Sequence, residues 1–484
     1  MADSFLLAHS TEPLLYDISA YLSPFSIRDQ MIRGYLIVER ALATGLIGEN
    51  RELLVVGAGM AGVVAAVTAA QRKIKVTIID KGEILGKLAG KAKRFIDPTL
   101  YDWPALHWQR ARFPFNDYSR IPLKYSHHSV GPMISAWRSA VYDAENSGYL
   151  KQLSYTRLVN YLRQSKNSAY PEDQIIKAYL KGVPSPDSSV ISDQSLREYK
   201  FGMVLSCVGF GKERCTVGKY TGYDFWDDTL YEEPNFGFTG GEKPNVIISG
   251  AGDGALQDYL LATTNQESPG GIYKAIKKKL PKNVIVWIER RIHNAEDQAR
   301  RSFHWGSGAH HDHDTFKLLH LQHQRVIDLL LKKFETELDQ ALSGIVKDVG
   351  QEINIKLLHR CDHFTNCYAL NRFLVLLISS YVLKKSGGRI KTIYPKSMIV
   401  EIQGHECDNM ATECHGNEHE VVYIPAESCF KEPDKSKDKY RYVKGGPYNV
   451  IIIRHGVDPS HPLFNKLPSS NPRQILPYYL DTTV

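Results

Sequence analysis

The sequence lacks the features of several large classes of protein. Its seven cysteines among 484 residues include no C-x-x-C pair, which removes the commonest dithiol and zinc-binding motifs. An odd number of unpaired cysteines is typical of reduced thiols rather than of a disulfide framework. No basic segment followed by an apolar run and a small-residue cleavage site opens the chain, so we expect no secretory signal and a cytoplasmic protein.

Long apolar runs and a large excess of one charge are also missing. The longest apolar stretch, residues 373–383, is about half as long as a bilayer-spanning helix requires. The 60 basic and 53 acidic side chains give a net charge of +7, and no basic segment is interleaved with aromatic residues. We therefore expect no membrane partner, disfavour a nucleic-acid partner, and expect a small-molecule substrate. A homo-oligomer is left open.

The most informative segment begins at residue 53. Residues 53–56 are apolar and predict a buried strand, and residues 63–72 predict a helix rich in alanine. Residues 75–79 predict a second strand. Between the first strand and the helix lies a glycine-rich turn, so the segment predicts a strand, turn, helix and strand in the order that binds dinucleotides.

Each glycine of this turn has a separate physical role. Gly57 allows the tight turn, Gly59 lets the backbone approach a pyrophosphate, and Gly62 lets the helix pack closely on the strand. The N–H groups at the start of the helix favour phosphate, and Asp80 can accept hydrogen bonds from an adenosine ribose. The residues that we expect to contact a dinucleotide here are Gly57, Gly59, Met60, Ala61, Gly62, Asp80 and Lys81.

Two later segments add to this pattern. Residues 200–209 predict an apolar strand that ends at Gly209. Residues 245–255 predict a second strand that runs through Gly250 and Gly252 into a helix. The two glycine units are consistent with duplication of one βαβ theme.

With both units placed, the chain resembles the FAD/NAD(P)-binding Rossmann-fold flavoprotein oxidoreductases, a superfamily with disulfide reductase-like and N-hydroxylating monooxygenase-like members. The resemblance implies that Gly57, Gly59, Gly62 and Asp80 bind the ADP half of FAD. It also implies that Gly209 lies near the crossing between domains, as in the apolar strand of that superfamily that ends in a small residue and glycine.

The second glycine unit has two interpretations. As a G-x-G-x-x-A turn it resembles a nicotinamide dinucleotide site, in which Arg290 and Arg291 after an expected strand at 283–289 would meet the 2′-phosphate of NADPH. Glu289 would instead suit the ribose of NADH.

Alternatively, residues 245–253 resemble the superfamily's late strand ending in Gly-Asp, whose acid holds the flavin ribityl chain. The long gap between the turn and the strand at 283–289 slightly favours this second interpretation. Both interpretations predict that Gly252 and Asp253 contact a ligand.

A proline- and aromatic-rich segment at residues 94–108 follows the first unit. Loops in this place reach the ligand side of a parallel sheet, so we predict that Trp103 lines the cofactor. Asp102 and His107 are the candidate catalytic residues, because each can exchange protons with a reduced flavin or its substrate. The alternative is that these aromatic residues form a satellite core.

The densest set of metal-capable side chains lies at residues 304–314. We expect no metal there, because the run precedes an expected helix that Asp312 or Asp314 can cap. Cys361 and Cys367 are too far apart for a typical redox pair, which favours a structural role.

We therefore predict an α/β fold in three parts: an N-terminal helical extension at 1–48, a Rossmann-type FAD domain with a parallel sheet at 49–265, and a larger α/β region at 266–484. The FAD domain carries an insertion at 95–198. The C-terminal region would bind nicotinamide or substrate. Apolar periodicity further predicts helices at 27–44, 132–145, 155–162, 315–342 and 371–385, and a strand at 448–456.

The function implied is that of an FAD-dependent oxidoreductase that transfers hydride between a small-molecule substrate or NAD(P)H and the flavin. FAD is the expected cofactor, and NADPH or NADH is a second candidate. The alternative is a sensor or scaffold protein that binds FAD or NAD(P) without turnover.

Overall fold

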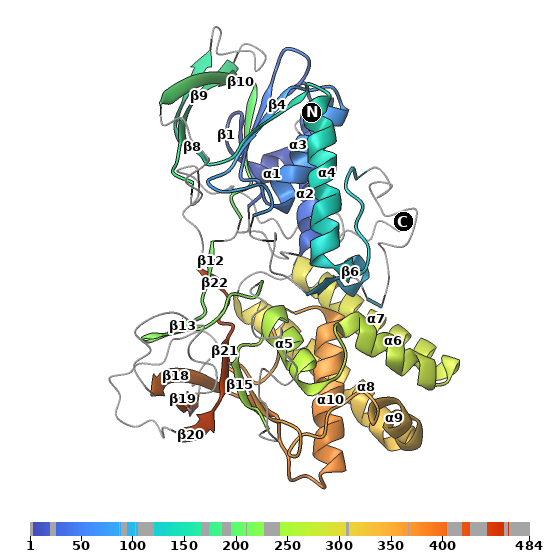
Figure 1. Cartoon of the computed structure of the whole chain (residues 1–484). Helices are drawn as coiled ribbons and strands as arrows, with labels where there is room; N and C mark the ends of the chain where they lie inside the picture. The colour runs from blue at the N-terminus through green and yellow to red at the C-terminus, as the bar shows by residue number, and fades with distance from the viewer. Residues whose placement is uncertain are drawn as a thin grey trace. The chain divides into compact units, whose positions relative to one another are not determined.

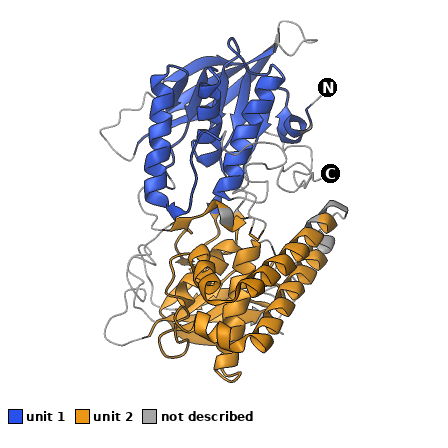
Figure 2. Ribbon diagram, turned by 90° about the vertical axis from the view of Figure 1, so that its right-hand side faces the viewer, with its two compact units in different colours: residues 1–92, 107–212, 458–484 blue, residues 93–106, 213–457 orange. Residues whose placement is uncertain are grey.

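The chain forms two compact units in a computed structural model (Figure 2). Unit 1 contains residues 1–92, 107–212 and 458–484, and unit 2 contains residues 93–106 and 213–457. The structure describes residues 3–19, 26–86, 88, 94–101, 103–104, 121–165, 174–185, 195–209, 211–226, 243–305, 309–365, 367–403, 419–425, 443–458 and 463.

Unit 1 is built on a six-stranded sheet with the order β1-β2-β11-β3-β4-β7, of which β1 and β4 are labelled in Figure 1. All neighbouring strands are parallel except β1 and β2. The strands of this sheet are β1 (Ser10–Glu12), β2 (Leu15–Asp17), β3 (Leu53–Val56), β4 (Val76–Ile79), β7 (Leu150–Leu153) and β11 (Met203–Ser206). Every residue of β3, β4 and β11 is buried, as expected for parallel strands covered on both faces.

The helices of unit 1 are α1 (Ser4–His9), α2 (Ile27–Ala43), α3 (Met60–Gln71) and α4 (Val130–Asn146). The Ser26 hydroxyl caps α2 by accepting the Asp29 N–H at 3.0 Å. A Cβ added at Gly34 would lie 2.3 Å from the Ala61 carbonyl oxygen. The backbones of α2 and α3 therefore approach closely, and this holds the helix that follows the first glycine turn.

A separate antiparallel sheet of unit 1 has the order β10-β9-β8. Its strands are β8 (Thr156–Ser165), β9 (Gln174–Gly182) and β10 (Leu196–Phe201), and the short strand β6 (His128–Ser129) precedes α4. This sheet lies in sequence between β7 and β11. It shares a core with the parallel sheet, in which Ile176 and Phe201 pack with Leu54 and Val204.

Unit 2 repeats this arrangement. Its parallel sheet has the order β17-β16-β15-β21, and its antiparallel sheet has the order β18-β19-β20. The strands are β15 (Asn245–Ser249), β16 (Asn354–His359), β17 (Ile393–Pro395), β18 (Ser397–Gln403), β19 (His419–Pro425), β20 (Val443–Tyr448) and β21 (Val450–Ile453). In both units the chain runs through three parallel strands, a three-stranded antiparallel sheet and a fourth parallel strand.

The helices of unit 2 are α5 (Asp253–Thr263), α6 (Pro269–Lys279), α7 (Lys282–Trp305), α8 (Ala309–Lys333), α9 (Glu335–Leu342) and α10 (Ala369–Lys385). They enclose the larger core of this unit together with β15, β16 and β21. Short elements complete the chain: β5 (Phe95–Ile96), the 3₁₀ helix η1 (Pro98–Tyr101), β12 (Lys212–Glu213), β13 (Thr216–Val217), β14 (Tyr220–Thr221) and β22 (Val457–Asp458).

The α/β fold with a parallel, Rossmann-type sheet is confirmed, as are the helices at 27–44, 132–145 and 371–385 within a few residues. Two predicted elements are wrong. Residues 156–162 of the helix predicted at 155–162 belong to strand β8, where pairing with β9 overrides a weak local helical pattern. Residues 283–289 belong to helix α7, in which Val284, Ile285, Ile288 and Ile292 are buried at helical spacing.

The unit boundaries also differ from the predicted ones. The predicted FAD domain at 49–265 includes β15, whereas β15 lies in the sheet of unit 2. The N-terminal extension predicted at 1–48 supplies β1 and β2 to the sheet of unit 1. Both differences arise because strand pairing joins segments that are distant in sequence.

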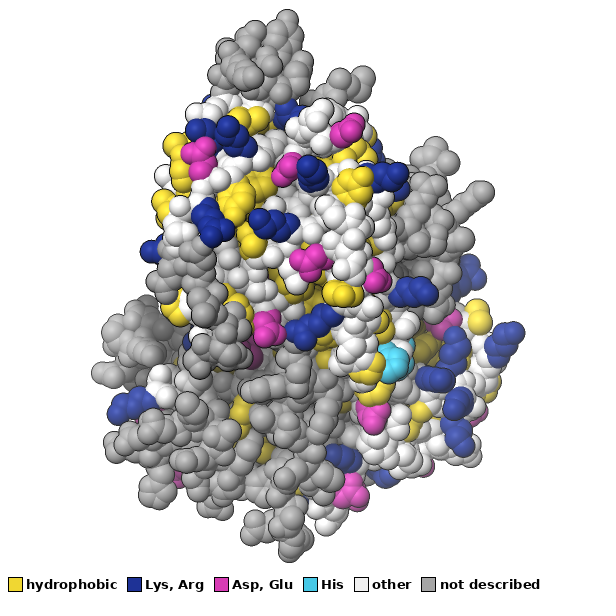
Figure 3. Space-filling view, turned by 45° about the horizontal axis from the view of Figure 1, so that its top comes forward, with side chains coloured by type: hydrophobic (Ala, Val, Ile, Leu, Met, Phe, Trp, Pro, Cys, Tyr) yellow, Lys and Arg dark blue, Asp and Glu magenta, His cyan; other side chains and the backbone are white. Residues whose placement is uncertain are grey.

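None of the helices in the described part of the chain is long and apolar enough to cross a bilayer. On the face shown in Figure 3, the described Lys and Arg side chains are interspersed with acidic and apolar ones.

Candidate dinucleotide sites

The first glycine turn joins β3 to α3 in unit 1. Gly57 has φ +104°, and a Cβ at this position would lie 2.4 Å from the Cys207 carbonyl oxygen. A Cβ at Gly62 would lie 1.9 Å from the Gly57 carbonyl oxygen. Only glycine fits either position without a backbone shift, so these residues have the conformational roles that the sequence predicts.

Gly59 differs from both. It is exposed and precedes α3 as its N-cap residue with φ −73°, and a Cβ there would meet no atom of the described residues within 4 Å. No described side chain caps the first turn of α3, so the N–H groups of this turn, which lack intrahelical partners, are not occupied by a described capping side chain. Free N–H groups and the positive end of the helix dipole are suited to a phosphate.

Asp80 follows β4 and holds the turn together. Its carboxylate accepts the Ala58 N–H at 2.6 Å and the Gly82 N–H at 2.8 Å. The side chain is half-buried beside the turn, and Lys81 next to it is exposed. The acid is therefore oriented by the backbone, while each carboxylate oxygen keeps a lone pair that could accept a ribose hydroxyl.

A buried polar group lies at the same edge of this sheet. Asp17 ends β2 and pairs in register with Ser206, the last residue of β11. Asp17 is 2% exposed, its Oδ1 accepts the Ser19 N–H at 2.7 Å, and burial raises its pKa. Its Oδ2 has no hydrogen-bond partner among the described residues. Sequence reasoning missed Asp17, because a three-residue strand before the first motif gives little signal.

Gly209 lies just beyond β11 with φ +80°. Cys207 between them is 4% exposed, and burial raises the pKa of its thiol. A buried thiol with a raised pKa is a poor nucleophile, so Cys207 has a structural role in this turn.

The second glycine turn reproduces the first in hydrogen-bond register. The Gly57 N–H donates to the Ile79 carbonyl at 2.8 Å, and the Gly250 N–H donates to the Leu358 carbonyl at 2.9 Å. A Cβ at Gly250 would lie 2.3 Å from the Arg454 carbonyl oxygen, as one at Gly57 would lie close to that of Cys207.

Gly252 repeats the features of Gly59. It is the N-cap residue of α5 with φ −82°, and a Cβ there would lie more than 4 Å from every atom that the structure describes. Ala255 takes the place of Gly62 and is fully buried. The geometry matches a complete G-x-G-x-x-A turn, which favours the nicotinamide interpretation. The flavin-closing interpretation does not fit, because β15 lies outside the sheet of unit 1.

Asp253 is the first residue of α5. Its Oδ1 accepts the Tyr368 N–H and the Asn371 amide N–H, both at 2.8 Å. These contacts join the starts of α5 and α10. Asp253 therefore fixes the edge of the second turn, and its predicted contact with a ligand stays a prediction.

Arg290 and Arg291 do not lie at a strand end, because both are within helix α7. The register of β15 with β16 instead places His359 where unit 1 has Asp80, with Arg360 next. Burial and nearby positive charge lower the pKa of His359 to about 4. This position thus has basic residues in place of the acid of unit 1. The difference is difficult to see in the sequence, because helices α6 to α9 lie between β15 and β16.

Arg454 follows β21 and has a structural role. Asp258 in α5 is fully buried between Arg94 and Arg454, with both N–O distances 2.8 Å. The Arg94 guanidinium also lies 3.9 Å from the centre of the Phe225 ring. This network fixes the start of α5 on the end of β21.

The segment at 94–108 differs from its predicted role. Trp103 is 5% exposed and packs in the core of unit 2, with ring centres 5.1 Å from Tyr273 and 5.4 Å from Phe373. Because its ring is buried in that core, the core alternative fits better. Asp102 and His107 lie outside the described residues, and their catalytic roles stay predictions.

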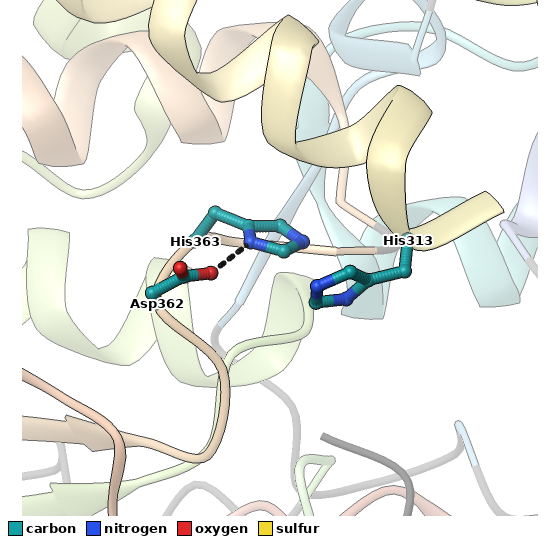
Figure 4. A group of neighbouring side chains, drawn as sticks. All are labelled: His313, Asp362 and His363. Carbon is teal, nitrogen blue, oxygen red and sulfur yellow. Dashed lines mark hydrogen bonds and ion pairs between the residues drawn. The ribbon is translucent and has the colours of Figure 1, made fainter. Parts of the chain in front are cut away.

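Part of the histidine-rich run contributes to a cluster in unit 2. His313 in α8 lies beside Asp362 and His363, which follow β16 (Figure 4). The prediction that Asp312 or Asp314 caps the helix is wrong, because α8 begins at Ala309 and includes both. Cys361 and Cys367, the predicted structural cysteines, form no disulfide with each other.

Comparison with known families identifies the first turn. Residues 55–115 match the model of the NAD(P)-binding Rossmann-like domain. The first glycine turn thus lies in the segment that matches a Rossmann-like dinucleotide-binding domain. This result agrees with the predicted FAD/NAD(P)-binding superfamily and with dinucleotide binding. No curated protein matches the sequence.

Solved structures of low sequence identity are similar to most of the chain. Thioredoxin reductase of Lactococcus lactis is 11% identical with a TM-score of 0.36, and the match covers 85% of this chain and 79% of that one. Bacillithiol disulfide reductase of Staphylococcus aureus is 10% identical with a TM-score of 0.37, over 85% and 77%. Thioredoxin reductase of T. acidophilum is 13% identical with a TM-score of 0.34, over 84% and 78%.

Proposed function

We propose that the protein is an FAD-dependent oxidoreductase in which unit 1 holds FAD and unit 2 holds a nicotinamide dinucleotide. The observation that carries this proposal is the repeated turn. Gly57 and Gly250 have the same hydrogen-bond register and the same close approach to a neighbouring carbonyl. Gly59 and Gly252 each leave open space before the N-terminus of a helix. Two such turns provide two pyrophosphate sites.

The difference between the units supports this assignment. Asp80 in unit 1 suits the free ribose hydroxyls of the ADP half of FAD. The corresponding place in unit 2 has His359 and Arg360, and a guanidinium suits a 2′-phosphate. We therefore propose NADPH rather than NADH as the hydride donor.

Asp17 supports the flavin half of the proposal. It ends a strand on the outer side of β11, at the carboxyl edge of the sheet where ligands of such folds bind. We propose that Asp17, and not Asp253, is the acid that closes the FAD site. Its Oδ2, which has no hydrogen-bond partner among the described residues, is the atom that we expect to contact the flavin side chain.

FAD, when bound, supplies the electron chemistry. The chain supplies binding and orientation through the two turns. Because no C-x-x-C pair is present, we propose that electrons pass from the flavin directly to a small-molecule acceptor and not through a dithiol of this type. That small-molecule acceptor would be the substrate of the enzyme.

Two matched substitutions test the assignment. Gly59→Ala and Gly252→Ala both add a methyl group to open space at ordinary φ, so both variants should fold. Losing one charge-assisted hydrogen bond costs about 1.5–3 kcal/mol. Gly59→Ala should thus weaken FAD binding by about 10- to 100-fold, measured by fluorescence titration of the apoprotein. Gly252→Ala should keep FAD and weaken NADPH to a similar degree, measured by anaerobic flavin reduction.

Three outcomes would count against the proposal. A wild-type protein that is colourless and takes up no FAD would refute the flavin assignment. Full FAD occupancy without reduction by NADPH or NADH would favour the sensor or scaffold alternative. If Gly252→Ala were reduced at the wild-type rate at low NADPH concentration, the second turn would not be the nicotinamide site.

A further inference from the structure

A cluster in unit 2 has the composition of a metal site that the dinucleotide chemistry does not use. His313 lies in α8, whereas Asp362 and His363 lie in the loop between β16 and α10. One nitrogen or oxygen atom from each lies within 4.8 Å of those of the other two. The imidazole rings of His313 and His363 have centres 4.4 Å apart, and Figure 4 shows them side by side.

The bonding of His363 leaves one nitrogen available for an ion. Its Nδ1 lies 2.5 Å from Asp362 Oδ1, which fixes the ring orientation and leaves Nε2 as the potential ligand atom. The His363 side chain is 1% exposed, and Nε2 has no hydrogen-bond partner among the described residues. A buried nitrogen without a partner is costly unless something binds it.

This pattern is common around protein-bound metals. A ligating histidine usually donates its other ring N–H to a carboxylate, which orients the ring and makes it a stronger ligand. Zinc prefers imidazole nitrogens at about 2.0–2.1 Å. Tetrahedral ligands of such an ion lie about 3.4 Å apart, and one ligand atom of each of the three residues lies within 4.8 Å of the other two. Rotation of the half-buried His313 side chain would bring its ring nitrogen to the ligand spacing, while Asp362 keeps the His363 ring in place.

We propose that this cluster binds one divalent transition-metal ion of the zinc class. His363 Nε2 and a ring nitrogen of His313 are the protein ligands, Asp362 is the carboxylate partner of His363, and water completes the coordination. The ion would link α8 to the loop after β16. That loop begins at Arg360, directly after His359 at the end of β16, so the ion would also stabilise the edge of the second dinucleotide turn.

One neighbouring charge opposes the ion. Lys317 Nζ lies 3.5 Å from Asp362 Oδ2, and its side chain is half-exposed. An ammonium group at this distance repels a divalent cation. Removing the charge should therefore tighten metal binding, an effect that a purely structural role of the cluster does not predict.

The test is calorimetric titration of the full-length, chelator-treated protein with zinc chloride. We expect one equivalent to bind to the wild type. His313→Ala and His363→Ala should each abolish this binding, and Asp362→Asn should weaken it by roughly 10- to 100-fold. Lys317→Gln should tighten it several-fold. The control is His128→Ala, which removes an exposed histidine of β6 and should leave binding unchanged. X-ray absorption of the zinc complex should show two imidazole ligands.

Each result supports or overturns the proposal. Absence of stoichiometric binding, or binding that survives both histidine substitutions, would overturn it; the second result would indicate an adventitious ion only. Loss of binding in Lys317→Gln or in His128→Ala would also overturn it. Circular dichroism of the metal-free variants checks folding. If His363→Ala does not fold, His313→Ala decides the question, because His313 lies on the partly exposed side of the cluster.

Discussion

Replacing Gly62 by alanine tests the close packing on which the first dinucleotide turn depends. In an exposed helix, Gly→Ala stabilises by about 1 kcal/mol, because alanine has the higher helix propensity. Here the added Cβ would lie 1.9 Å from the Gly57 carbonyl oxygen and 3.2 Å from Val55 Cγ1. Both neighbours are held by the core, so α3 must shift away from β3.

The magnitude follows from comparing the two effects. Overpacking a rigid core costs about 1–3 kcal/mol and sometimes more. The 1.9 Å contact involves backbone and not the end of a flexible side chain, so we expect the upper part of that range. Subtracting the gain in propensity leaves a net destabilisation of roughly 1–2 kcal/mol.

Urea unfolding of the apoproteins measures this difference, with Gly59→Ala as the control. That control adds the same methyl group to the same turn, where it meets no atom within 4 Å. Its free energy of unfolding should lie within about 0.5 kcal/mol of the wild type. The reasoning fails if Gly62→Ala is as stable as the wild type, because α3 would then not be pressed against the turn.

Two further predictions concern buried charge. Asp258→Asn should destabilise the protein by about 3–5 kcal/mol, because two buried arginines lose their shared partner. The control is Glu39→Gln, at a partly exposed pair with Arg72, which should cost about 0–1 kcal/mol in the same urea assay. Equal losses of stability in the two variants would contradict the role of burial. Burial first, and then the positive charge of Arg33, lower the pKa of His9 to about 3 from 6.5. The unfolded state therefore binds a proton that folded His9 does not. Lowering the pH from 7 to 5 should then remove about 2 kcal/mol of stability, and His9→Gln should reduce this loss by that amount. A pH dependence identical to that of the wild type would disprove the shift.

Much of the first site could be read directly from the sequence. The strand at 53–56, the glycines at 57, 59 and 62 and the acid at 80 are close together in the chain, and their spacing carries the backbone geometry. The same holds for α2, where a serine cap and a following glycine mark both ends. Local patterns were sufficient because the contacts involved are local.

The errors occurred where contacts are distant in sequence. The apolar run at 283–289 is compatible with a strand or a buried helix, and only packing in unit 2 makes it helix α7. His359 and Arg360, at the end of β16, were missed because helices α6 to α9 separate β15 from β16 in the sequence. Trp103 was predicted as a cofactor contact, although it packs with Tyr273 and Phe373.

The sequence by itself determined that a dinucleotide-type turn starts at Gly57 and that a second glycine turn follows at Gly250, because glycine spacing encodes backbone conformations that other residues cannot adopt. Tertiary structure decided what surrounds these turns. Pairing of β2 with β11 brought Asp17 to the first, and pairing of β15 with β16 brought His359 and Arg360 to the second. Such pairings depend on burial and hydrogen bonding between distant segments, which no local pattern specifies.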